Sequence, residues 1–208
     1  MNVATKRGIS LLSVVGKLYG KVLIKRVRAG TQCAIGEEQC GIRPGRGCMD
    51  QVLAVRQVCE KYLANGKNVF WVFMDLEKPY DTIDRHGMWQ MLKVYGIKGK
   101  LLKAVHSFYV DSRACVRVGN DVSEWFPVNV GLRQGCAMSP RLFNINTEGV
   151  VREVIVGVLE KGLELLSANG SRFEINQLLF GDDTALVADS EEKLYRLVSE
   201  FGRMCERS

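Results

Sequence analysis

Apolar residues recur every three to four positions in six segments of the chain, which is the spacing of one helix face. This pattern predicts helices over residues 9–28, 49–65, 86–95, 100–110, 139–159 and 191–205. In the first segment the repeat consists of Leu11, Val15, Leu18, Tyr19 and Val22. Gly66 follows the second segment directly, as a glycine often does where a helix ends.

Shorter apolar runs predict strands over residues 69–76, 113–118, 125–130, 173–180 and 184–188. The first run, VFWVFMDL, is apolar at nearly every position, which is typical of a central strand buried on both faces. Turn sequences at 119–121 (GND) and 181–183 (GDD) would join the other four strands in pairs. Helices and strands are therefore mixed along one continuous unit.

Composition narrows the class of protein. The 208 residues are 47% hydrophobic and 25% charged, which is ordinary for one globular domain and excludes a disordered or collagen-like chain. No apolar run approaches the roughly 18 residues of a membrane span, and the N-terminus lacks the apolar stretch of a signal peptide. The seven cysteines include no Cys-x-x-Cys pair, so we expect reduced thiols. We therefore expect an intracellular protein, cytoplasmic or nuclear, that is neither secreted nor bound to a membrane.

Positive charge is concentrated in the first part of the chain. Residues 1–60 hold ten Lys and Arg against four Asp and Glu, which accounts for the whole formal net charge of +6. In the first predicted helix, one face carries Lys17, Lys21, Lys25 and Arg28. This basic stripe fits the phosphate backbone of a nucleic acid. Taken alone, a solvated helix face is the simpler explanation.

Three carboxylates lie at the ends of predicted strands. Asp182 and Asp183 form part of a plain turn signal, but a divalent cation would remove the repulsion between them. Mg²⁺ is typically held by one or two carboxylates plus substrate phosphates. Asp75 ends the run 69–76, where a charge is costly unless it is paired, metal-bound or part of a cap or turn. If these strands are neighbours, the carboxylates converge and can hold two metal ions about 3.5–4 Å apart.

Two loops hold the remaining candidates. Residues 37–47 (EEQCGIRPGRG) contain Arg43 and Arg46, whose guanidinium groups suit phosphate geometry. Residues 132–143 (LRQGCAMSPRLF) precede a predicted helix. There Gly135 would let a substrate approach the backbone closely, and Gln134 offers hydrogen-bond donors and acceptors. Each segment by itself is an ordinary loop.

Taken in order, these segments resemble the reverse transcriptases of non-long-terminal-repeat (LINE-like) retrotransposons, and more distantly those of group II introns. Residues 37–47 are similar to the fingers motif that ends in Gly-x-Arg-Pro-Gly-Arg. Residues 73–81 (FMDLEKPYD) are similar to palm motif A, 132–144 to motif B and 179–183 (LFGDD) to motif C. RNA-dependent RNA polymerases share the Gly-Asp-Asp turn, but their motif B is built around Ser-Gly, where this chain has Gln134-Gly135.

The resemblance implies roles for the acidic residues and for one tyrosine. Asp75 and Asp182 would be the catalytic metal ligands, with the backbone carbonyl of Leu76 as a further ligand and Asp183 in a supporting role. Tyr80 matches the steric-gate position, where an aromatic ring excludes a ribose 2′-hydroxyl. The metal would be Mg²⁺, as two ions, with Mn²⁺ as a substitute.

The same resemblance assigns the loops and the substrates. Arg43 or Arg46 would grip the incoming triphosphate, and Gln134 and Gly135 would border the nucleotide and the template base. The reaction would be attack of a DNA primer 3′-hydroxyl on a dNTP, directed by an RNA template. The oligomeric state is left open.

The implied fold is α+β, the fingers–palm part of a right-hand polymerase, in which helices pack on an antiparallel palm sheet. We expect a fingers portion over residues 1–66 and a palm portion over 67–208, without a thumb.

Several positions depart from the family pattern, Ala137 and Met138 of motif B among them. Pro79 replaces an alanine and removes an N–H between Asp75 and Tyr80, Gly181 replaces another alanine, and Arg141 puts a charge at the start of an apolar helix. Pro79 and the expected lack of a thumb favour an alternative, a catalytically dead relic that keeps the fold and nucleic-acid binding. A different two-metal enzyme such as a nuclease gives no role to Tyr80 or to Gln134-Gly135.

Overall fold

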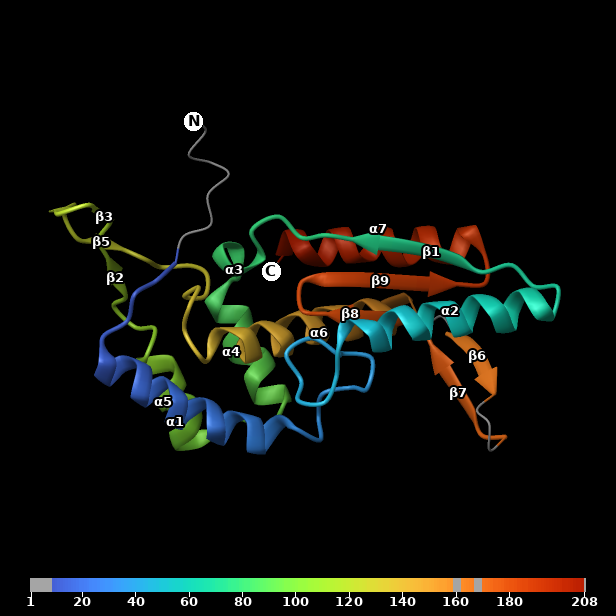
Figure 1. Cartoon of the computed structure of the whole chain (residues 1–208), viewed down its shortest axis with the longest axis horizontal. Coiled ribbons are helices and arrows are strands. Elements are labelled where there is room, and N and C mark those ends of the chain that lie inside the picture. Colours follow the sequence, from blue (N-terminus) through green and yellow to red (C-terminus); the bar gives the residue numbers. More distant parts are fainter. Residues whose placement is uncertain (1–8, 159–161, 167–169, 208) are drawn as a thin grey trace. The chain divides into compact units, whose positions relative to one another are not determined.

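A computed structural model describes residues 9–158, 162–166 and 170–207. The chain forms two compact units that interleave along the sequence (Figure 1). The first unit comprises Met1–Ala34 and Lys78–Ile145, and the second comprises Ile35–Glu77 and Asn146–Ser208. The assignment of residues 1–66 to fingers and 67–208 to palm stays a prediction.

The second unit is built on an antiparallel sheet with the strand order β1–β9–β8. Its strands are β1 (Phe70–Met74), β8 (Gln177–Phe180) and β9 (Asp183–Ala188). The pairing of β1 with β9 runs from Phe70↔Ala188 to Met74↔Thr184, and β8 pairs with β9 up to Phe180↔Asp183. A separate ribbon consists of β6 (Leu163–Leu166) and β7 (Arg172–Ile175).

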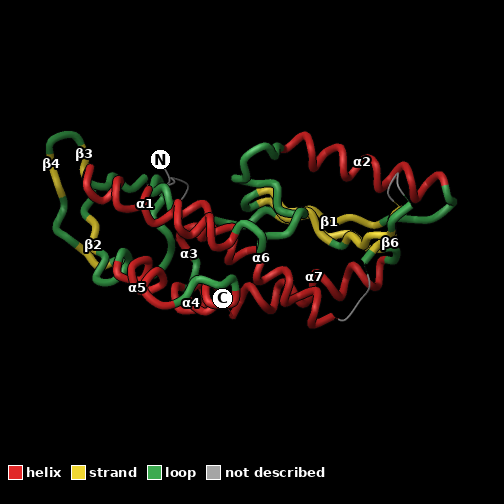
Figure 2. Tube along the Cα trace, turned by 90° about the horizontal axis from the view of Figure 1, so that it is seen from below, coloured by secondary structure: helices red, strands yellow, loops and turns green. Residues whose placement is uncertain are grey.

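Helices cover both faces of the three-stranded sheet (Figure 2). On one face, α2 (Cys48–Ala64) packs with the β6–β7 ribbon against Leu178, Ala185 and Val187. On the other face, α7 (Glu191–Arg207) and the later residues of α6 (Ser139–Val158) pack against Leu179 and Leu186. The sheet is thus the middle layer of this unit, and the ends of its strands are held from both sides.

The first unit is mainly helical. Its helices are α1 (Val14–Thr31), α3 (Pro79–Thr82), α4 (Arg85–Val94), α5 (Gly99–Ser107) and the first residues of α6. Two short ribbons pair β2 (Arg113–Ala114) with β5 (Phe126–Pro127) and β3 (Arg117–Val118) with β4 (Asp121–Val122). Arg141 is buried here and donates to the hydroxyl of Thr31 from Nη2 at 2.9 Å, so part of its hydrogen-bonding capacity at the start of α6 is satisfied.

The predicted helices are confirmed, although the first begins at Val14 and not at residue 9, but three strand predictions are wrong. The run 113–118 is not one strand, because it divides between β2 and β3, which belong to different sheets. β1 lies at an edge of the three-stranded sheet and not at its centre, and Phe73 is 68% exposed. The run 173–180 is not one strand, because Ile175 ends β7 in one sheet and Gln177 begins β8 in another. Leu159, at the end of the predicted helix 139–159, lies outside the described residues.

The helix α1 has an apolar surface on two sides. Five of its residues are buried and form its packing face: Gly20, Leu23, Ile24, Val27 and Thr31. The repeat that predicts the helix is instead exposed, with Leu11 and Val15 at 85% and 76%. No helix in the described ranges is both long enough and apolar enough to cross a membrane.

Candidate active site

Two of the three candidate carboxylates lie on the same face of the three-stranded sheet. Met74 pairs with Thr184, so the next residue, Asp75, stands beside Asp183 at the start of β9. Both side chains are exposed, and both line a hollow of about 340 Å³ formed by the sheet and α2. Like charges opposite one another on antiparallel strands destabilise the pairing. The strand register therefore creates a place where a cation is stabilising.

Asp182 occupies the turn between β8 and β9 and does not line this hollow. Gly181, just before it, has a φ of 67°, which glycine adopts without strain. A two-residue hairpin turn commonly has glycine at its first central position. The glycine in place of the family's alanine thus has a backbone reason. The side chain of Leu76 packs against the core formed with α6 and α7, so only its backbone is available as a ligand.

The donor chemistry of these residues fits Mg²⁺ when a substrate contributes. Mg²⁺ is commonly held by one or two carboxylates, with phosphates and water completing its octahedron. Asp75 and Asp183 supply two carboxylates at one hollow. Across the described ranges, no three His, Cys, Asp or Glu side chains are arranged to hold a metal ion. A metal here would therefore depend on phosphate oxygens for the rest of its ligands.

Residues 37–47, the arginine loop, carry Arg43 and Arg46. This loop packs directly against the turn at Gly181 and Asp182, the carboxylate turn. Its residue Gln39 lies in a parallel bridge with Leu179 of β8. Cys40 N–H donates to the Leu179 carbonyl at 2.9 Å. A Cβ at position 41 would overlap the backbone nitrogen of Gly181 and lie 2.7 Å from the carbonyl carbon of Phe180. Only glycine at position 41 permits this approach.

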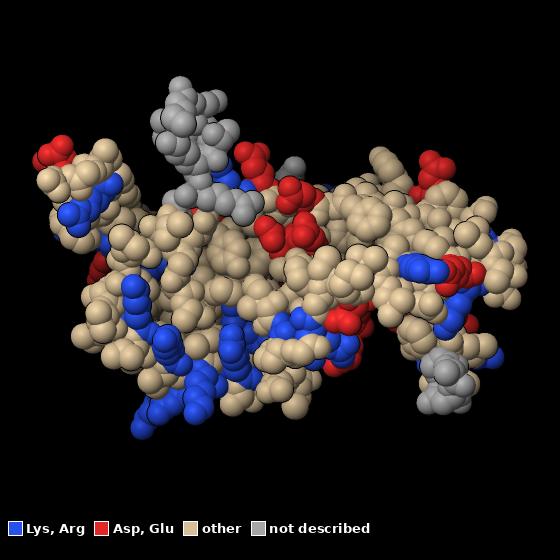
Figure 3. All heavy atoms as spheres, in the orientation of Figure 1, with Lys and Arg blue, Asp and Glu red and all other residues tan. Residues whose placement is uncertain are grey.

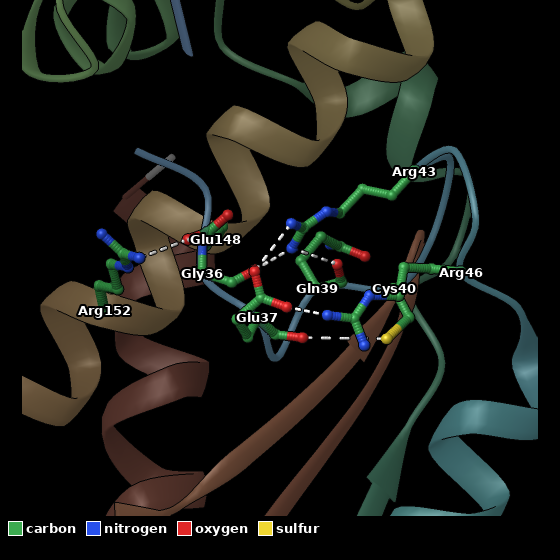
Figure 4. A network of polar contacts seen from close by, with 8 residues as sticks. All are labelled: Gly36, Glu37, Gln39, Cys40, Arg43, Arg46, Glu148 and Arg152. Atoms are coloured by element: carbon green, nitrogen blue, oxygen red, sulfur yellow. Dashed lines mark hydrogen bonds and ion pairs between the residues drawn. The ribbon is translucent and has the colours of Figure 1, made fainter. Parts of the chain in front are cut away.

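Glu37 pairs with both arginines of the loop (Figure 4). Arg43 also donates to the carbonyls of Gly36 at 2.6 Å and Gln39 at 3.3 Å, and its side chain is only 17% exposed. Arg46 has a side chain that is 40% exposed. Arg43 therefore stabilises the loop itself, and Arg46 is the more accessible cation.

A buried glutamate of α6 anchors the start of the same loop (Figure 4). Glu148 accepts a hydrogen bond from Gly36 N–H at 2.7 Å and pairs with Arg152 at 2.7 Å, while its side chain is 1% exposed. Because only Glu148 is buried, the loss of Arg152 would leave a buried carboxylate without its cation, which is destabilising. Nearby, burial raises the pKa of the Cys40 thiol, and the Asp50 carboxylate raises it further. This thiol therefore stays protonated at neutral pH.

Tyr80 lies in the first unit on the short helix α3. Its ring stacks on Phe143 with centroids 4.6 Å apart and an interplanar angle of 10°. Its carbonyl accepts from Leu132 N–H at 2.6 Å. Pro79 is the first residue of α3, where a backbone N–H would have no partner within the helix, so the proline costs no hydrogen bond there. The departure at position 79 is therefore compatible with a well-packed Tyr80.

Gln134 and Gly135 are brought close to the same short helix. Gln134 Nε2 donates to Asp81 Oδ1 at 3.1 Å, and its carbonyl accepts from Ser10 N–H at 2.8 Å. Gly135 has a φ of 91°. At position 131, a Cβ would lie 2.7 Å from the Asp81 carbonyl oxygen, so a glycine lets the two segments meet. The first unit thus assembles the predicted gate and motif B.

An arginine that the sequence did not single out holds the segment before Gln134. Arg85 donates to the carbonyls of Val128 at 2.7 Å and Gly131 at 2.9 Å, and stacks over the Tyr109 ring. Burial lowers the pKa of Arg85. Burial also raises the pKa of Tyr109 to about 12, so both groups keep their usual protonation at neutral pH.

The basic stripe of α1 is exposed along its length, and Figure 3 shows Lys and Arg side chains gathered over this helix. Lys17, Lys21, Lys25 and Arg28 are all exposed, as a surface for a polyanion requires. Exposure agrees equally with a solvated face.

Three residues that shape the site were not found from the sequence: Gln39, Glu148 and Arg85. Glu148 could have been found from the sequence, because a charged residue within an apolar helical stretch indicates a buried, paired side chain. Gln39 and Arg85 act on backbone groups far along the chain, and no local pattern marks such contacts.

The chain matches the family described as reverse transcriptase (RNA-dependent DNA polymerase) over residues 2–208. It is 24% identical to an uncharacterised 149 kDa protein of transposon TX1 from Xenopus laevis, over 91% of this chain. It is 22% identical to the Pol polyprotein of the R2 retrotransposable element from Nasonia vitripennis, over 97% of this chain. The chain spans 14% and 19% of the length of these two relatives.

Solved structures with a similar fold include two fungal telomerases. The telomerase of Candida tropicalis, in complex with a fragment of telomeric RNA, has a TM-score of 0.60 at 14% identity and is matched by 92% of this chain. That of Candida albicans has a TM-score of 0.59 at 12% identity, over 93% of this chain. This chain covers 32% of each of them. With the match along nearly its whole length, the chain belongs to the reverse transcriptase (RNA-dependent DNA polymerase) family.

Proposed function

We propose that this chain contributes the nucleotidyl-transfer site of an RNA-directed DNA polymerase of a retrotransposon. The observation that carries the proposal is the packing of the Arg43–Arg46 loop against the Gly181–Asp182 turn, beside the facing carboxylates of Asp75 and Asp183. Cationic and anionic groups at one place suit a dNTP with its metal ions. In this proposal, residues 1–66 act as fingers and residues 67–208 as palm.

The carboxylates would hold the metal ions. We assign Asp75, Asp182 and the Leu76 carbonyl to two Mg²⁺ ions, for which Mn²⁺ can substitute, with Asp183 sharing the charge from β9. When bound, the ions stabilise negative charge on the attacking and leaving oxygens of a phosphoryl displacement. The protein's part is to hold these oxygen ligands before the substrate arrives, because catalysis of this kind rests on positioning and fixed charge.

Arg46 would bind the triphosphate of the incoming dNTP. Its exposed guanidinium supports this choice, while the contacts of Arg43 to two carbonyls support a role inside the loop. Gln134 and Gly135 would border the nucleotide and the template base. No step of this scheme uses either histidine.

The function is tested by DNA synthesis on an RNA template with a DNA primer, using the full-length protein that carries this chain. We expect incorporation of dNTPs that requires Mg²⁺ or Mn²⁺. Binding of template and primer without any incorporation in either metal would contradict the proposal and favour a relic that only binds nucleic acid.

Tyr80→Ala is expected to admit ribonucleotides. The stack of Tyr80 on Phe143 holds the ring, so its removal opens space for a 2′-hydroxyl. Steric discrimination of this size is worth about 10- to 100-fold in relative kcat/KM. Competition between a dNTP and its ribonucleotide measures the ratio, and Tyr80→Phe, which keeps the ring, is the control. Unchanged exclusion of ribonucleotides in Tyr80→Ala would place the gate elsewhere.

The stripe of α1 is proposed to contact the phosphate backbone of the RNA template or the primer. The affinity falls as salt rises, so the plot of log affinity against log salt has a negative slope. Replacing Lys17, Lys21, Lys25 and Arg28 with glutamine should make this slope shallower by about three. An unchanged slope would make the stripe a solvated helix face.

A further inference from the structure

Gln39 is a fully buried amide at the meeting point of the arginine loop and the carboxylate turn. Its side chain is 0% exposed, and it lies in the segment that runs beside β8. Its oxygen Oε1 accepts from Gly41 N–H at 2.8 Å and from Gly181 N–H at 3.3 Å. One oxygen atom therefore holds a backbone group of each element.

The orientation of this amide is fixed by its partners. Both neighbours are N–H donors, so only the oxygen of the amide can face them. The other end, Nε2, has no hydrogen-bond partner among the described residues. A buried polar atom without a partner costs free energy and calls for an explanation. The amide is thus stabilising here only through its oxygen, and that oxygen acts on the turn and on the loop.

The backbone of the same residue extends the link to the arginine. The Gln39 carbonyl accepts from Arg43 Nη1 at 3.3 Å, and Arg43 pairs in turn with Glu37 (Figure 4). A series of hydrogen bonds and one ion pair therefore connects the arginine loop, through Gln39, to Gly181, the residue before Asp182. A shift of the loop would reach the turn through this side chain as well as through the backbone contacts of Cys40 and Gly41.

We propose that Gln39 is a positioning residue, which fixes the Gly181–Asp182 turn and so sets the carboxylates for metal binding without touching metal or substrate. The proposal rests on the function proposed above for these carboxylates. It goes beyond that function because it names a residue outside them that determines their affinity for a divalent cation.

The test is Gln39→Met, which keeps the length of the side chain and removes the acceptor. Amide hydrogen exchange of Gly41 and Gly181 is expected to accelerate about tenfold. The affinity for Mn²⁺ in the presence of a dNTP, measured by calorimetry, is expected to fall about tenfold. The thermal midpoint should change little, because the unpartnered Nε2 is removed as well. Faster exchange with unchanged Mn²⁺ affinity would overturn the positioning role.

Gln177→Met is the matched control, because Gln177 is a buried glutamine at the far end of β8 with an unpartnered oxygen. It should leave both the exchange of Gly181 and the Mn²⁺ affinity unchanged, and an equal loss in this control would overturn the proposal. If Gln39→Met does not fold, Gln39→Glu keeps an oxygen acceptor and should keep Gly181 protected, and its loss of protection would count against the proposal. A wild-type protein that binds no Mn²⁺ even with a dNTP present contradicts the proposed function, whereas the exchange of Gly181 still tests the contact with Gln39.

Discussion

Asp75→Asn is expected to lower the rate of DNA synthesis by about 100- to 1,000-fold, the usual cost of removing one group that stabilises charge in the transition state. The side chain keeps its size, so the hollow it lines with Asp183 keeps its shape. Single-turnover extension of a labelled primer by the full-length protein measures the loss.

The same substitution should make the fold slightly more stable. Asp75 faces Asp183 across two antiparallel strands, and replacing one of two like charges removes a repulsion worth roughly 0.2–1 kcal/mol. The opposite signs of the two effects separate a metal-binding carboxylate from a structural one, whose loss would lower activity and stability together. Asp121→Asn, at an exposed position of β4, is the control and should change neither.

Gly41→Ala is expected to lower the free energy of unfolding by about 2–3 kcal/mol, in the range of overpacking substitutions. The added Cβ would overlap the backbone of Gly181, and backbone cannot move aside as the end of a flexible side chain can. Because the displaced residue precedes Asp182, activity should fall with stability. Chemical denaturation and primer extension measure the two losses.

The matched control for that substitution lies in the same loop. Gly47 has an extended φ of −143°, and a Cβ there would lie 4.0 Å from its nearest neighbour, Asp50 Oδ2. Gly47→Ala should therefore leave stability and activity nearly unchanged. Equal losses in both variants would mean that the loop needs glycine for flexibility, and not for its approach to Gly181.

The helices were predictable because their amphipathic repeats are long, whereas three of the strand predictions failed for physical reasons. The run at 69–76 is apolar on both faces, but β1 lies at an edge and exposes Phe73. Periodicity reports apolar side chains and does not report how many neighbouring strands cover them. The break at Asn176 is similar, since a single asparagine within an apolar run is a weak signal for the change from one sheet to another.

In the site, the closeness of Asp75 and Asp183 followed from their places at strand ends, once the strands were assumed to be neighbours. The contact between Gly41 and Gly181 could not be predicted, because it joins residues far apart in the sequence through a backbone approach that leaves no pattern. The burial of Gln39 could not be predicted either, because a single glutamine in a loop is compatible with full exposure to solvent.

The pairing of Glu37 with Arg46 gives the arginine loop an internal competitor for its own ligand. A triphosphate that binds Arg46 must first displace a carboxylate tethered in the same loop, which lowers the apparent affinity by the fraction of time that the pair is closed. Both partners are exposed, at 40% and 69%, and exposed pairs are worth about 0–1 kcal/mol, or at most about a fivefold effect. The competitor would therefore lower the affinity of any anion for Arg46 by the same small factor, which is too weak to block a polyvalent anion.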